Sequence, residues 1–432
     1  MSACGQTEET VFTGRTDPNP LASDIPWLHG NLSVQPYDPL SPYAGVLNDC
    51  VYLGYRKDSC TLLRLPPLGF SAPSAAPSVD QIMGRVLVSH EWMGQRLREV
   101  LDAYPEDLRF LFRPVTAVVI STDVRPSFYW GFTGAIYIDP AYLWRTLEEY
   151  EGVSPAPDPR SDYARDLSFA MPRRIVQGNR HVYRPRPREA TYRSFESVRL
   201  STARLLYHEL AHANDWLVPE RLAHTSPYQS FETLAKQEVG VELGALLPLR
   251  SQVMTGLAHV AYWGWTASAA QKAYTPDLVA SEFAGDGANV FYNYSTAAED
   301  VAMLFEELMM FDRFGVDYDV AVCPRAGVPT PTGSDYLVAW GQRNRIGDRT
   351  VRERVRLVAR RLLPEVPLDA AIDALPLPRQ MVPGRTWTDN LALVASGRLE
   401  PLDPEARREA DQFEIETQID CATARFNQAP PR

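Results

Sequence analysis

Apolar residues recur along the chain at spacings that predict several helices and a few short strands. Helical spacing predicts a helix over 78–103, another over about 195–217 and a third over about 297–311. Ser295 and Thr296 precede the third helix and can cap it. Short apolar runs predict strands at 110–112, 116–121 and 134–138.

This mixture of elements predicts an α+β fold. We expect a small twisted sheet within about 106–150 and a mostly helical second lobe. Prolines crowd the residues before 78 and exclude long helices and central strands, so residues 1–77 are expected to form a tether and an extended segment with a hairpin between Cys50 and Cys60. The predicted central region covers 78–320, and residues 321–432 form a C-terminal extension.

Composition and charge narrow the class of protein. The 432 residues are 45% hydrophobic and 22% charged, which suffices for a globular core. A net charge of −11 argues against nucleic acid as the main partner, because phosphate binding needs a basic face. The uncharged stretch 251–271 contains several polar residues and glycines, so we expect a buried helix there and no transmembrane span.

The five cysteines point to an oxidising compartment. Met1-Ser2-Ala3-Cys4 is similar to the end of a bacterial lipoprotein signal, so we expect a trimmed signal with a lipid anchor at Cys4; an ordinary N-terminus is the alternative. The other four can form two disulfides, and we expect Cys50 to pair with Cys60 and Cys323 with Cys421. These features predict a periplasmic or surface lipoprotein of the bacterial cell envelope.

A short motif supplies the candidate chemistry. Residues 208–212 read HELAH, an HExxH pattern that places His208 and His212 one helical turn apart on one face. Both imidazoles can bind one zinc ion, and Glu209 can reach the water that the metal activates. The motif is therefore the framework of metal-assisted hydrolysis, with Glu209 as the general base.

A catalytic zinc needs a third protein ligand. The metzincin arrangement requires a histidine six residues after the second motif histidine, and Val218 occupies that position. The other common solution is a glutamate from a later helix. Glu299 lies in the first turn of the predicted 297–311 helix, which is apolar on nearly every side, and a carboxylate buried there needs a partner or a metal. Glu238 and Glu242 are the competing candidates.

The HExxH motif, followed by Asp215 and later by Tyr292 and Glu299-Asp300, resembles the zinc domain of the gluzincin metallopeptidases, in particular the lethal-factor-like group of secreted bacterial peptidases. The resemblance implies a zincin-like catalytic domain. In it, His208, His212 and Glu299 bind one Zn²⁺ per chain.

The same resemblance implies that Tyr292 stabilises the oxyanion or protonates the leaving amine, with Tyr294 as the alternative phenol. Two features depart from the family pattern. Glu299 lies 87 positions after His212 (299 − 212), a long separation. Met303 stands where the group often carries a second acidic residue.

Further residues are expected to support the site. Asp215 can accept a hydrogen bond from a ligand imidazole, or it is only a polar residue at the helix end. Glu306 shares a helical face with Glu299 and can accept a hydrogen bond behind the ligands. In zincin folds the last strand before the metal helix commonly lies at the rim of the cleft and can pair with substrate. The residues expected there are Gly134, Ala135, Ile136 and Tyr137.

These expectations together predict a zinc endopeptidase that hydrolyses protein or peptide substrates. Two alternatives stay open. One is a catalytically silent zincin-fold binding or scaffold lipoprotein, and the other is a zinc amidase that acts on cell-wall peptides.

Overall fold

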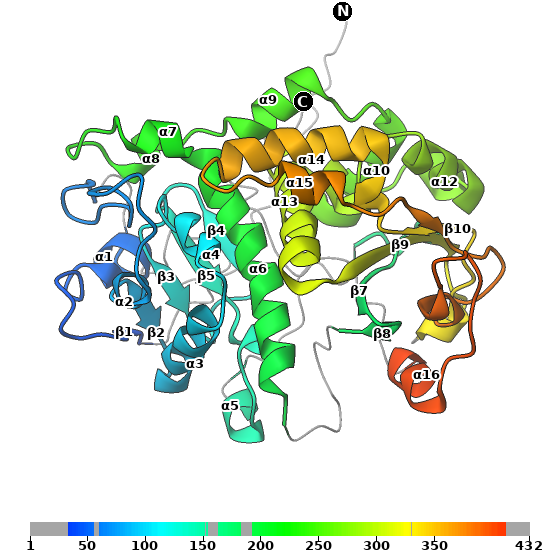
Figure 1. The fold of residues 1–432 in the computed structure, drawn as a ribbon, viewed down its shortest axis with the longest axis horizontal. Coiled ribbons are helices and arrows are strands. Elements are labelled where there is room, and N and C mark those ends of the chain that lie inside the picture. The colour runs from blue at the N-terminus through cyan, green and yellow to red at the C-terminus, as the bar shows by residue number, and fades with distance from the viewer. Residues whose placement is uncertain are drawn as a thin grey trace, which may run out of the picture.

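The chain folds into an α+β structure with two separate sheets (Figure 1). The computed structural model describes residues 33–55, 60–151, 153, 163–182, 192–329 and 331–411. Its strands are β1 Gln35–Pro36, β2 Val86–Val88, β3 Val118–Ile120, β4 Phe128–Trp130, β5 Ala135–Ile138, β6 Phe169–Ala170, β7 Arg173–Gln177, β8 Arg180–His181, β9 Asp317–Pro324, β10 Trp340–Arg343 and β11 Arg379–Gln380.

Helices cover both sheets and connect them. The α-helices are α1 Leu47–Val51, α2 Val79–Met83, α3 Glu91–Asp102, α4 Asp107–Phe110, α5 Leu147–Glu151, α6 Phe195–Trp216, α7 Pro219–Leu222, α8 Phe231–Leu234, α9 Val239–Leu246, α10 Gln252–Trp263, α11 Ala269–Ala273, α12 Pro276–Ala284, α13 Ala297–Phe314, α14 Arg349–Leu362, α15 Asp369–Asp373 and α16 Pro404–Asp411. Short 3-10 helices lie at η1 Pro140–Tyr142, η2 Phe291–Tyr294, η3 Gly333–Asp335, η4 Arg345–Gly347 and η5 Asp389–Ala392.

The first sheet has the strand order β1-β2-β3-β5-β4. Strands β2, β3 and β5 run parallel, whereas β1 and β4 pair antiparallel to their neighbours. Alternate side chains enter two different cores, because both faces of the sheet are covered. Val118 and Ile136 pack in the core that contains residues of α3 and α6. Val119 and Tyr137 face the opposite way and pack with residues of α1.

Two predicted elements near this sheet are wrong. The helix expected over 78–103 is interrupted, because α2 ends at Met83 and the buried run of β2 joins the sheet before α3 begins. The strand expected at 110–112 is the end of α4 followed by a turn. Both segments are apolar, and helical and extended patterns are hard to tell apart over such short runs.

The predicted substrate edge is also wrong. Gly134 precedes β5, and Ala135, Ile136 and Tyr137 lie within it. This strand pairs with β3 on one side and with β4 on the other, so its backbone groups are hydrogen-bonded within the sheet and cannot pair with a substrate. The edge strands of the described sheet are β1 and β4.

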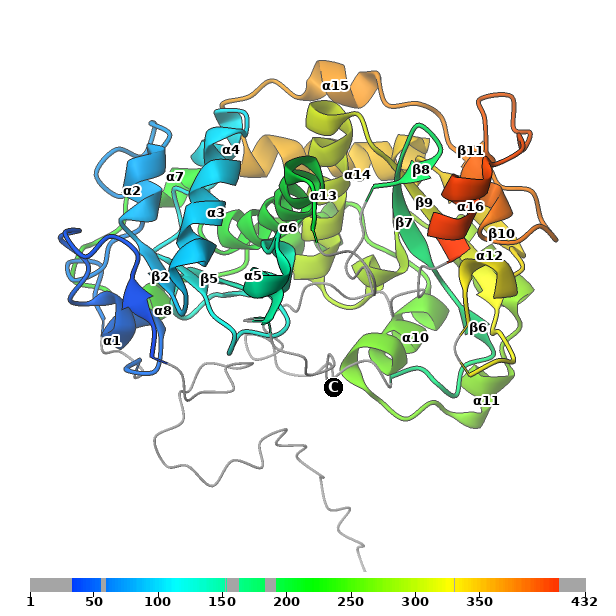
Figure 2. The ribbon, with the colours of Figure 1, turned by 90° about the horizontal axis from the view of Figure 1, so that it is seen from below.

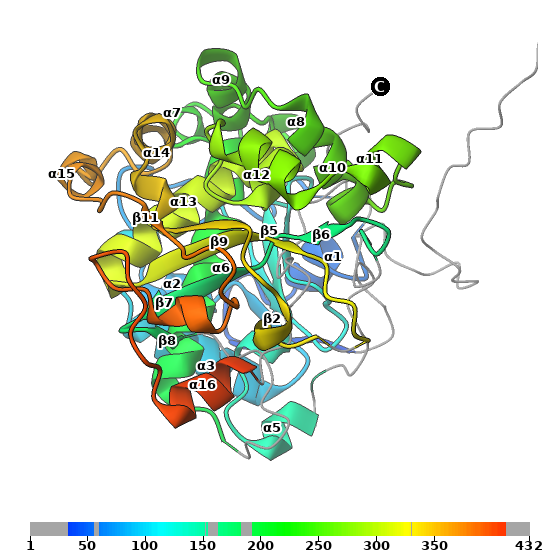
Figure 3. The same ribbon diagram turned by 90° about the vertical axis from the view of Figure 1, so that its right-hand side faces the viewer.

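The second sheet joins residues from both sides of the HExxH motif. Its order is β11-β10-β9-β7-β8, with β6 pairing to the far end of β9, and every pair is antiparallel. Figure 3 shows the molecule from the side on which this sheet lies. The second lobe therefore combines this sheet with the helices that follow α6.

The predicted domain boundaries do not match the sheets. The boundary expected between 320 and 321 falls inside β9, so the following residues complete the second sheet. At the other end of the chain, β1 pairs with β2, so part of the 1–77 segment belongs to the first sheet.

Helices α6 and α13 lie side by side between the two sheets (Figures 1 and 2). Apolar residues of both helices share one core, and the rings of Tyr207 and Phe305 meet edge to face across the interface at 6.3 Å. Burial of a large apolar side chain contributes roughly 1.5–3 kcal/mol, so this interface holds the helix pair firmly. The two helices carry the candidate ligands.

No described helix could cross a membrane, because each one is too short or too polar. The uncharged stretch 251–271 forms α10 and the start of α11. Most of α10 is buried in the core beside η2, which agrees with the buried helix expected there.

Candidate metal centre

Helix α6 carries both histidines of the HExxH motif. Ser194 caps it by accepting a hydrogen bond from the Ser197 backbone N–H, and the helix runs to Trp216, within one residue of the predicted end. His208 and His212 lie one turn apart and are almost completely buried. Glu209, next to His208, is also fully buried.

Helix α13 brings the candidate carboxylate to the same place. Thr296 caps it as predicted, since its hydroxyl accepts a hydrogen bond from the Glu299 backbone N–H at 3.1 Å. Glu299 is thus held in the first helical turn, and its side chain has no solvent exposure. The competing glutamates lie in ion pairs elsewhere, Glu238 with Arg221 and Glu242 with Arg361.

The three side chains form a compact donor group. Glu299 Oε2 lies 3.0 Å from His208 Nε2 and 3.5 Å from His212 Nε2. The two Nε2 atoms are 3.2 Å apart. Together, His208, His212 and Glu299 form a buried group that can hold a metal ion.

The electrostatics of this group favour a positive charge at its centre. Burial alone would lower the pKa of His208, but hydrogen bonds to Glu299 and Glu306 raise it to about 10. Burial would likewise raise the pKa of Glu299, yet the two imidazoles hold it well below its usual range. Burial lowers the pKa of His212. A metal ion satisfies the same demand for positive charge once His208 is deprotonated.

Glu306 supports His208 from behind. One of its oxygens lies 3.0 Å from His208 Nδ1, and the Tyr318 hydroxyl donates to the other at 2.8 Å. Arg173 and Arg204 each approach the carboxylate to 3.7 Å. Burial alone would raise the pKa of Glu306, but Arg204 and His208 lower it to about 2. The carboxylate is therefore charged and can hold an Nδ1–H, which leaves Nε2 for a metal.

Sequence reasoning did not identify three of these neighbours. Arg204 precedes His208 by one helical turn, so its place on the ligand face could have been inferred. Tyr318 on β9 and Arg173 on β7 come from opposite sides of the motif in the sequence. Only the pairing of these strands brings them to Glu306.

Asp215 does not contact a ligand imidazole. Its Oδ1 accepts the backbone N–H of Gly240 at 2.8 Å, on the side facing α9. His212 Nδ1 has no hydrogen-bond partner in the described part of the chain, so the expected bond between them is absent. Burial raises the pKa of Asp215 to about 6, although its hydrogen bonds oppose the shift.

The two candidate phenols lie in different places. The Tyr292 hydroxyl donates to Glu299 Oε1 at 2.6 Å, and its ring is nearly parallel to that of His208, with the centroids 6.4 Å apart. The Tyr294 hydroxyl instead donates to Asp286 at 3.1 Å. Only Tyr292 is in contact with the donor group.

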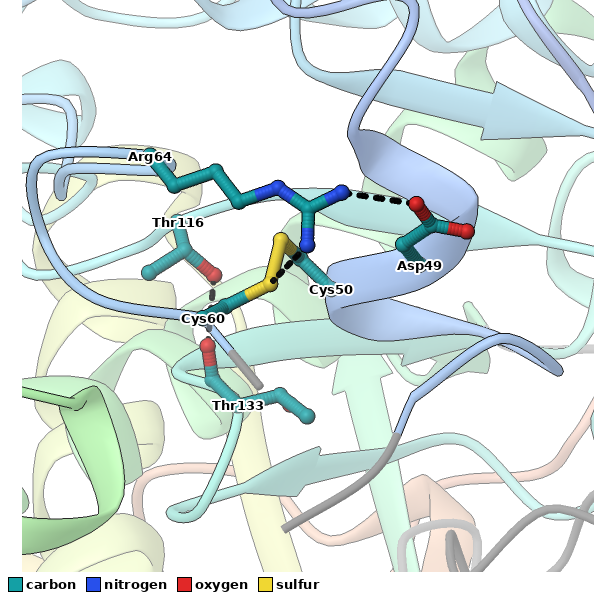
Figure 4. Close-up of a disulfide and its surroundings, with 6 residues drawn as sticks. All are labelled: Asp49, Cys50, Cys60, Arg64, Thr116 and Thr133. Atoms are coloured by element: carbon teal, nitrogen blue, oxygen red, sulfur yellow. Dashed lines mark hydrogen bonds and ion pairs between the residues drawn. A yellow bond between two sulfur atoms is a disulfide. The ribbon is translucent and has the colours of Figure 1, made fainter. Parts of the chain in front are cut away.

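The disulfide between Cys50 and Cys60 is present as predicted (Figure 4), but Cys50 lies on helix α1 and residues 52–55 form no strand, so the expected hairpin is wrong. Arg64 lies across it, donating to Asp49 at 2.7 Å and to Cys60 Sγ at 3.6 Å. Cys323 is a buried residue of β9, and burial raises its thiol pKa to about 12. Its expected partner Cys421, like the expected lipid-bearing Cys4, lies outside the described residues.

Comparisons with protein-family models, with curated proteins and with solved structures found no match to this chain.

Proposed function

We propose that this protein is a zinc-dependent peptidase that hydrolyses peptide bonds in protein or peptide substrates, with one Zn²⁺ per chain. The observation that carries the proposal is the buried group of two imidazoles and one carboxylate beside Glu209. Ligand atoms about 2.0–2.1 Å from a tetrahedral zinc lie roughly 3.3 Å from one another. The distances of 3.0, 3.2 and 3.5 Å between the three donor atoms fit that requirement.

The origin of the third donor supports a gluzincin-type site. Glu299 comes from a helix far downstream of the motif, as the resemblance implies. Met303 leaves no acidic group one turn after it, and Glu306 occupies the place behind His208 instead. We assign to Glu306 the role of holding the His208 imidazole in the tautomer that binds the metal.

Each proposed step uses a named side chain. A zinc ion held by the three donors supplies Lewis acidity toward water and a substrate carbonyl. Glu209 takes the proton from the attacking water and delivers it to the leaving nitrogen. Tyr292 donates a hydrogen bond to the developing oxyanion. Its hydroxyl contacts Glu299 and therefore lies beside the proposed metal ligands.

We also propose that the protein works in the bacterial cell envelope. The Cys50–Cys60 disulfide supports an oxidising compartment. A lipid anchor at Cys4 stays a prediction from the first four residues.

The test combines metal content with turnover. Purified protein is expected to contain one zinc per chain by elemental analysis and to cleave casein or members of a peptide library. Glu209→Gln keeps the size of the side chain and all three metal donors but lacks the base. It should retain zinc and lose roughly 10²–10⁴-fold in turnover.

Zinc at one per chain without Glu209-dependent cleavage of any peptide would instead favour the scaffold alternative. Cleavage confined to cell-wall peptides would favour the amidase. Loss of zinc from Glu238→Ala but not from Glu299→Ala would overturn the ligand assignment.

A further inference from the structure

One residue of helix α9, Gly240, lies against both ligand-bearing helices. Gly240, the second residue of α9, is buried. Its backbone N–H donates to Asp215 Oδ1 at 2.8 Å, three residues after His212 on α6. On its other side, a Cβ added at Gly240 would lie 2.8 Å from the carbonyl oxygen of Ala297, the first residue of α13. The same Cβ would lie 2.3 Å from Gln237 Nε2, so a larger residue at this position would require both the Gln237 amide and the Ala297 backbone to move.

The segment that leads into α9 is tied to the end of α6. The Glu238 N–H donates to the Asp215 carbonyl at 3.0 Å, and the Lys236 N–H donates to the Trp216 carbonyl at 3.0 Å. Residues 236–240 therefore follow the last turn of α6 closely. A displacement of this segment is passed to α6, to α13 or to both.

The metal donors lie close to these two contacts. His212 is one turn before the end of α6, and Glu299 is two residues after Ala297. The Nε2 to Oε2 distance of 3.5 Å between them is the longest of the three donor spacings. Gly240 therefore lies between the end of α6 and the start of α13. These two helix ends must stay at a fixed distance for His212 and Glu299 to bind a common metal ion.

We infer that Gly240 and Asp215 are positioning residues that fix the spacing between His212 and Glu299. This inference rests on the proposed metal site. Gly240 allows the close approach of α9 to Ala297, and Asp215 holds the Gly240 backbone there. Neither residue touches the metal donors. Each acts through the position of the two ligand-bearing helices, and we expect its substitution to weaken metal binding.

Two glycines of α9 provide a matched pair for the test. Gly240→Ala places a methyl group against Gln237 Nε2 and the Ala297 backbone, whereas Gly244→Ala adds the same group to the same helix with nothing within 4 Å. Zinc affinity is measured by competition with a chromophoric chelator, and folding by the thermal unfolding of the metal-free proteins. Gly240→Ala should raise the zinc dissociation constant about 10-fold or more, a typical effect of residues behind metal ligands. Gly244→Ala should stay within about twofold of the unmodified protein, because it touches neither ligand helix.

Asp215→Ala tests the same junction without adding volume, should Gly240→Ala fail to fold. It removes the acceptor for the Gly240 N–H and should also weaken zinc binding, while Asp215→Asn, which keeps an acceptor oxygen, should lose less. Unchanged zinc affinity in folded Gly240→Ala, or in Asp215→Ala, would overturn the inference. These readouts do not depend on turnover, so a protein that binds zinc but cleaves nothing would contradict the proposed peptidase and leave this inference standing.

Discussion

His208 is the residue on which the charges of the donor group converge. It lies between two buried carboxylates, with Glu299 at Nε2 and Glu306 at Nδ1. In the metal-free protein these contacts raise its pKa to about 10. A metal must displace that proton from Nε2, since only the neutral imidazole can be a ligand.

Zinc affinity is therefore expected to increase with pH. Between pH 6 and 8 the metal-free imidazole stays protonated, because this whole window lies below its pKa of about 10. Each zinc bound then releases one proton from His208, and the dissociation constant should fall about tenfold per pH unit. Calorimetry in buffers of different ionisation enthalpy would count the released proton. A dissociation constant that is the same at pH 6 and pH 8 would contradict this account.

Glu307, beside Glu306 on α13, is a buried carboxyl group whose pKa is raised. Its carboxyl group accepts a hydrogen bond from Asn289 at 2.7 Å. Burial, reinforced by the charge of Glu306, raises its pKa from 4.5 to about 8. The folded protein thus holds a proton there that the unfolded chain releases above pH 4.5, so Glu307 lowers the free energy of unfolding as pH rises from about 4.5 to about 8.

Glu307→Gln should remove this dependence. The amide keeps an oxygen to accept from Asn289 and stays neutral at every pH. At pH 8 the variant is expected to be more stable than the unmodified protein by on the order of 4 kcal/mol, since the pKa rises from 4.5 to about 8 and one pKa unit corresponds to about 1.4 kcal/mol. At pH 4.5 the two should be similar. Urea unfolding at both pH values gives the comparison, with Glu353→Gln on the exposed side of α14 as the control.

At the scale of elements, the N-terminal turn of α13 matters most for the site. The Thr296 cap orients the turn that carries Glu299. Thr275 caps α12 in the same way, accepting a hydrogen bond from the Leu278 N–H at 3.3 Å, but none of the three metal donors lies on that helix. The two threonines separate the role of a cap in stability from its role in metal binding.

Thr296→Ala and Thr275→Ala should each lower the free energy of unfolding by about 1 kcal/mol, the usual cost of a lost cap. Only Thr296→Ala is expected to weaken zinc binding, because it loosens the turn that holds Glu299. Denaturant unfolding and chelator competition on both variants provide the measurements. An equal loss of zinc affinity in both would show that the effect comes from general destabilisation.

The same scale shows what the sequence could and could not predict. The long helix of the motif and the capped helix of Glu299 were predictable, because each has a clear start signal and a sustained apolar pattern. The three residues of β2 are buried and apolar, which fits the helical spacing of 78–103 equally well. Strand order depends on contacts between distant segments, so the residues of β5 alone could not show that this strand lies between β3 and β4.

For the whole molecule, β9 connects the residues before and after the site. Asp319 on this strand pairs with Arg174 on β7 at 2.8 Å and with Arg343 on β10 at 2.6 Å, all three buried. Arg354 on α14 pairs with Asp300, next to Glu299, and Arg345 donates to the carbonyl oxygens of Phe283 and Ala288 at 2.6 Å. The C-terminal residues thus hold the segment that carries Tyr292 and Glu299.

A chain that ends at residue 320 should therefore not behave as a domain. It lacks part of β9 and the arginines Arg343, Arg345 and Arg354. Asp319 then keeps Arg174 but loses Arg343, Asp300 loses Arg354, and each broken buried ion pair costs several kcal/mol. We expect no cooperative thermal transition and no stoichiometric zinc binding. A truncated protein that unfolds cooperatively and retains one zinc per chain would show that the metal-donor group is independent of the C-terminal residues.

The pairing of β7 with β9 also sets an order of events during synthesis. The chain leaves the ribosome from its N-terminus, so both imidazoles of the motif emerge before Glu299 has been made. Residues 174 and 319, which meet across this pairing, are 145 positions apart. Contacts over such separations form late, because a long loop must close first. The nascent chain therefore carries two histidines without their carboxylate, and the complete donor group for a metal ion is expected only after most of the protein has been translated and folded.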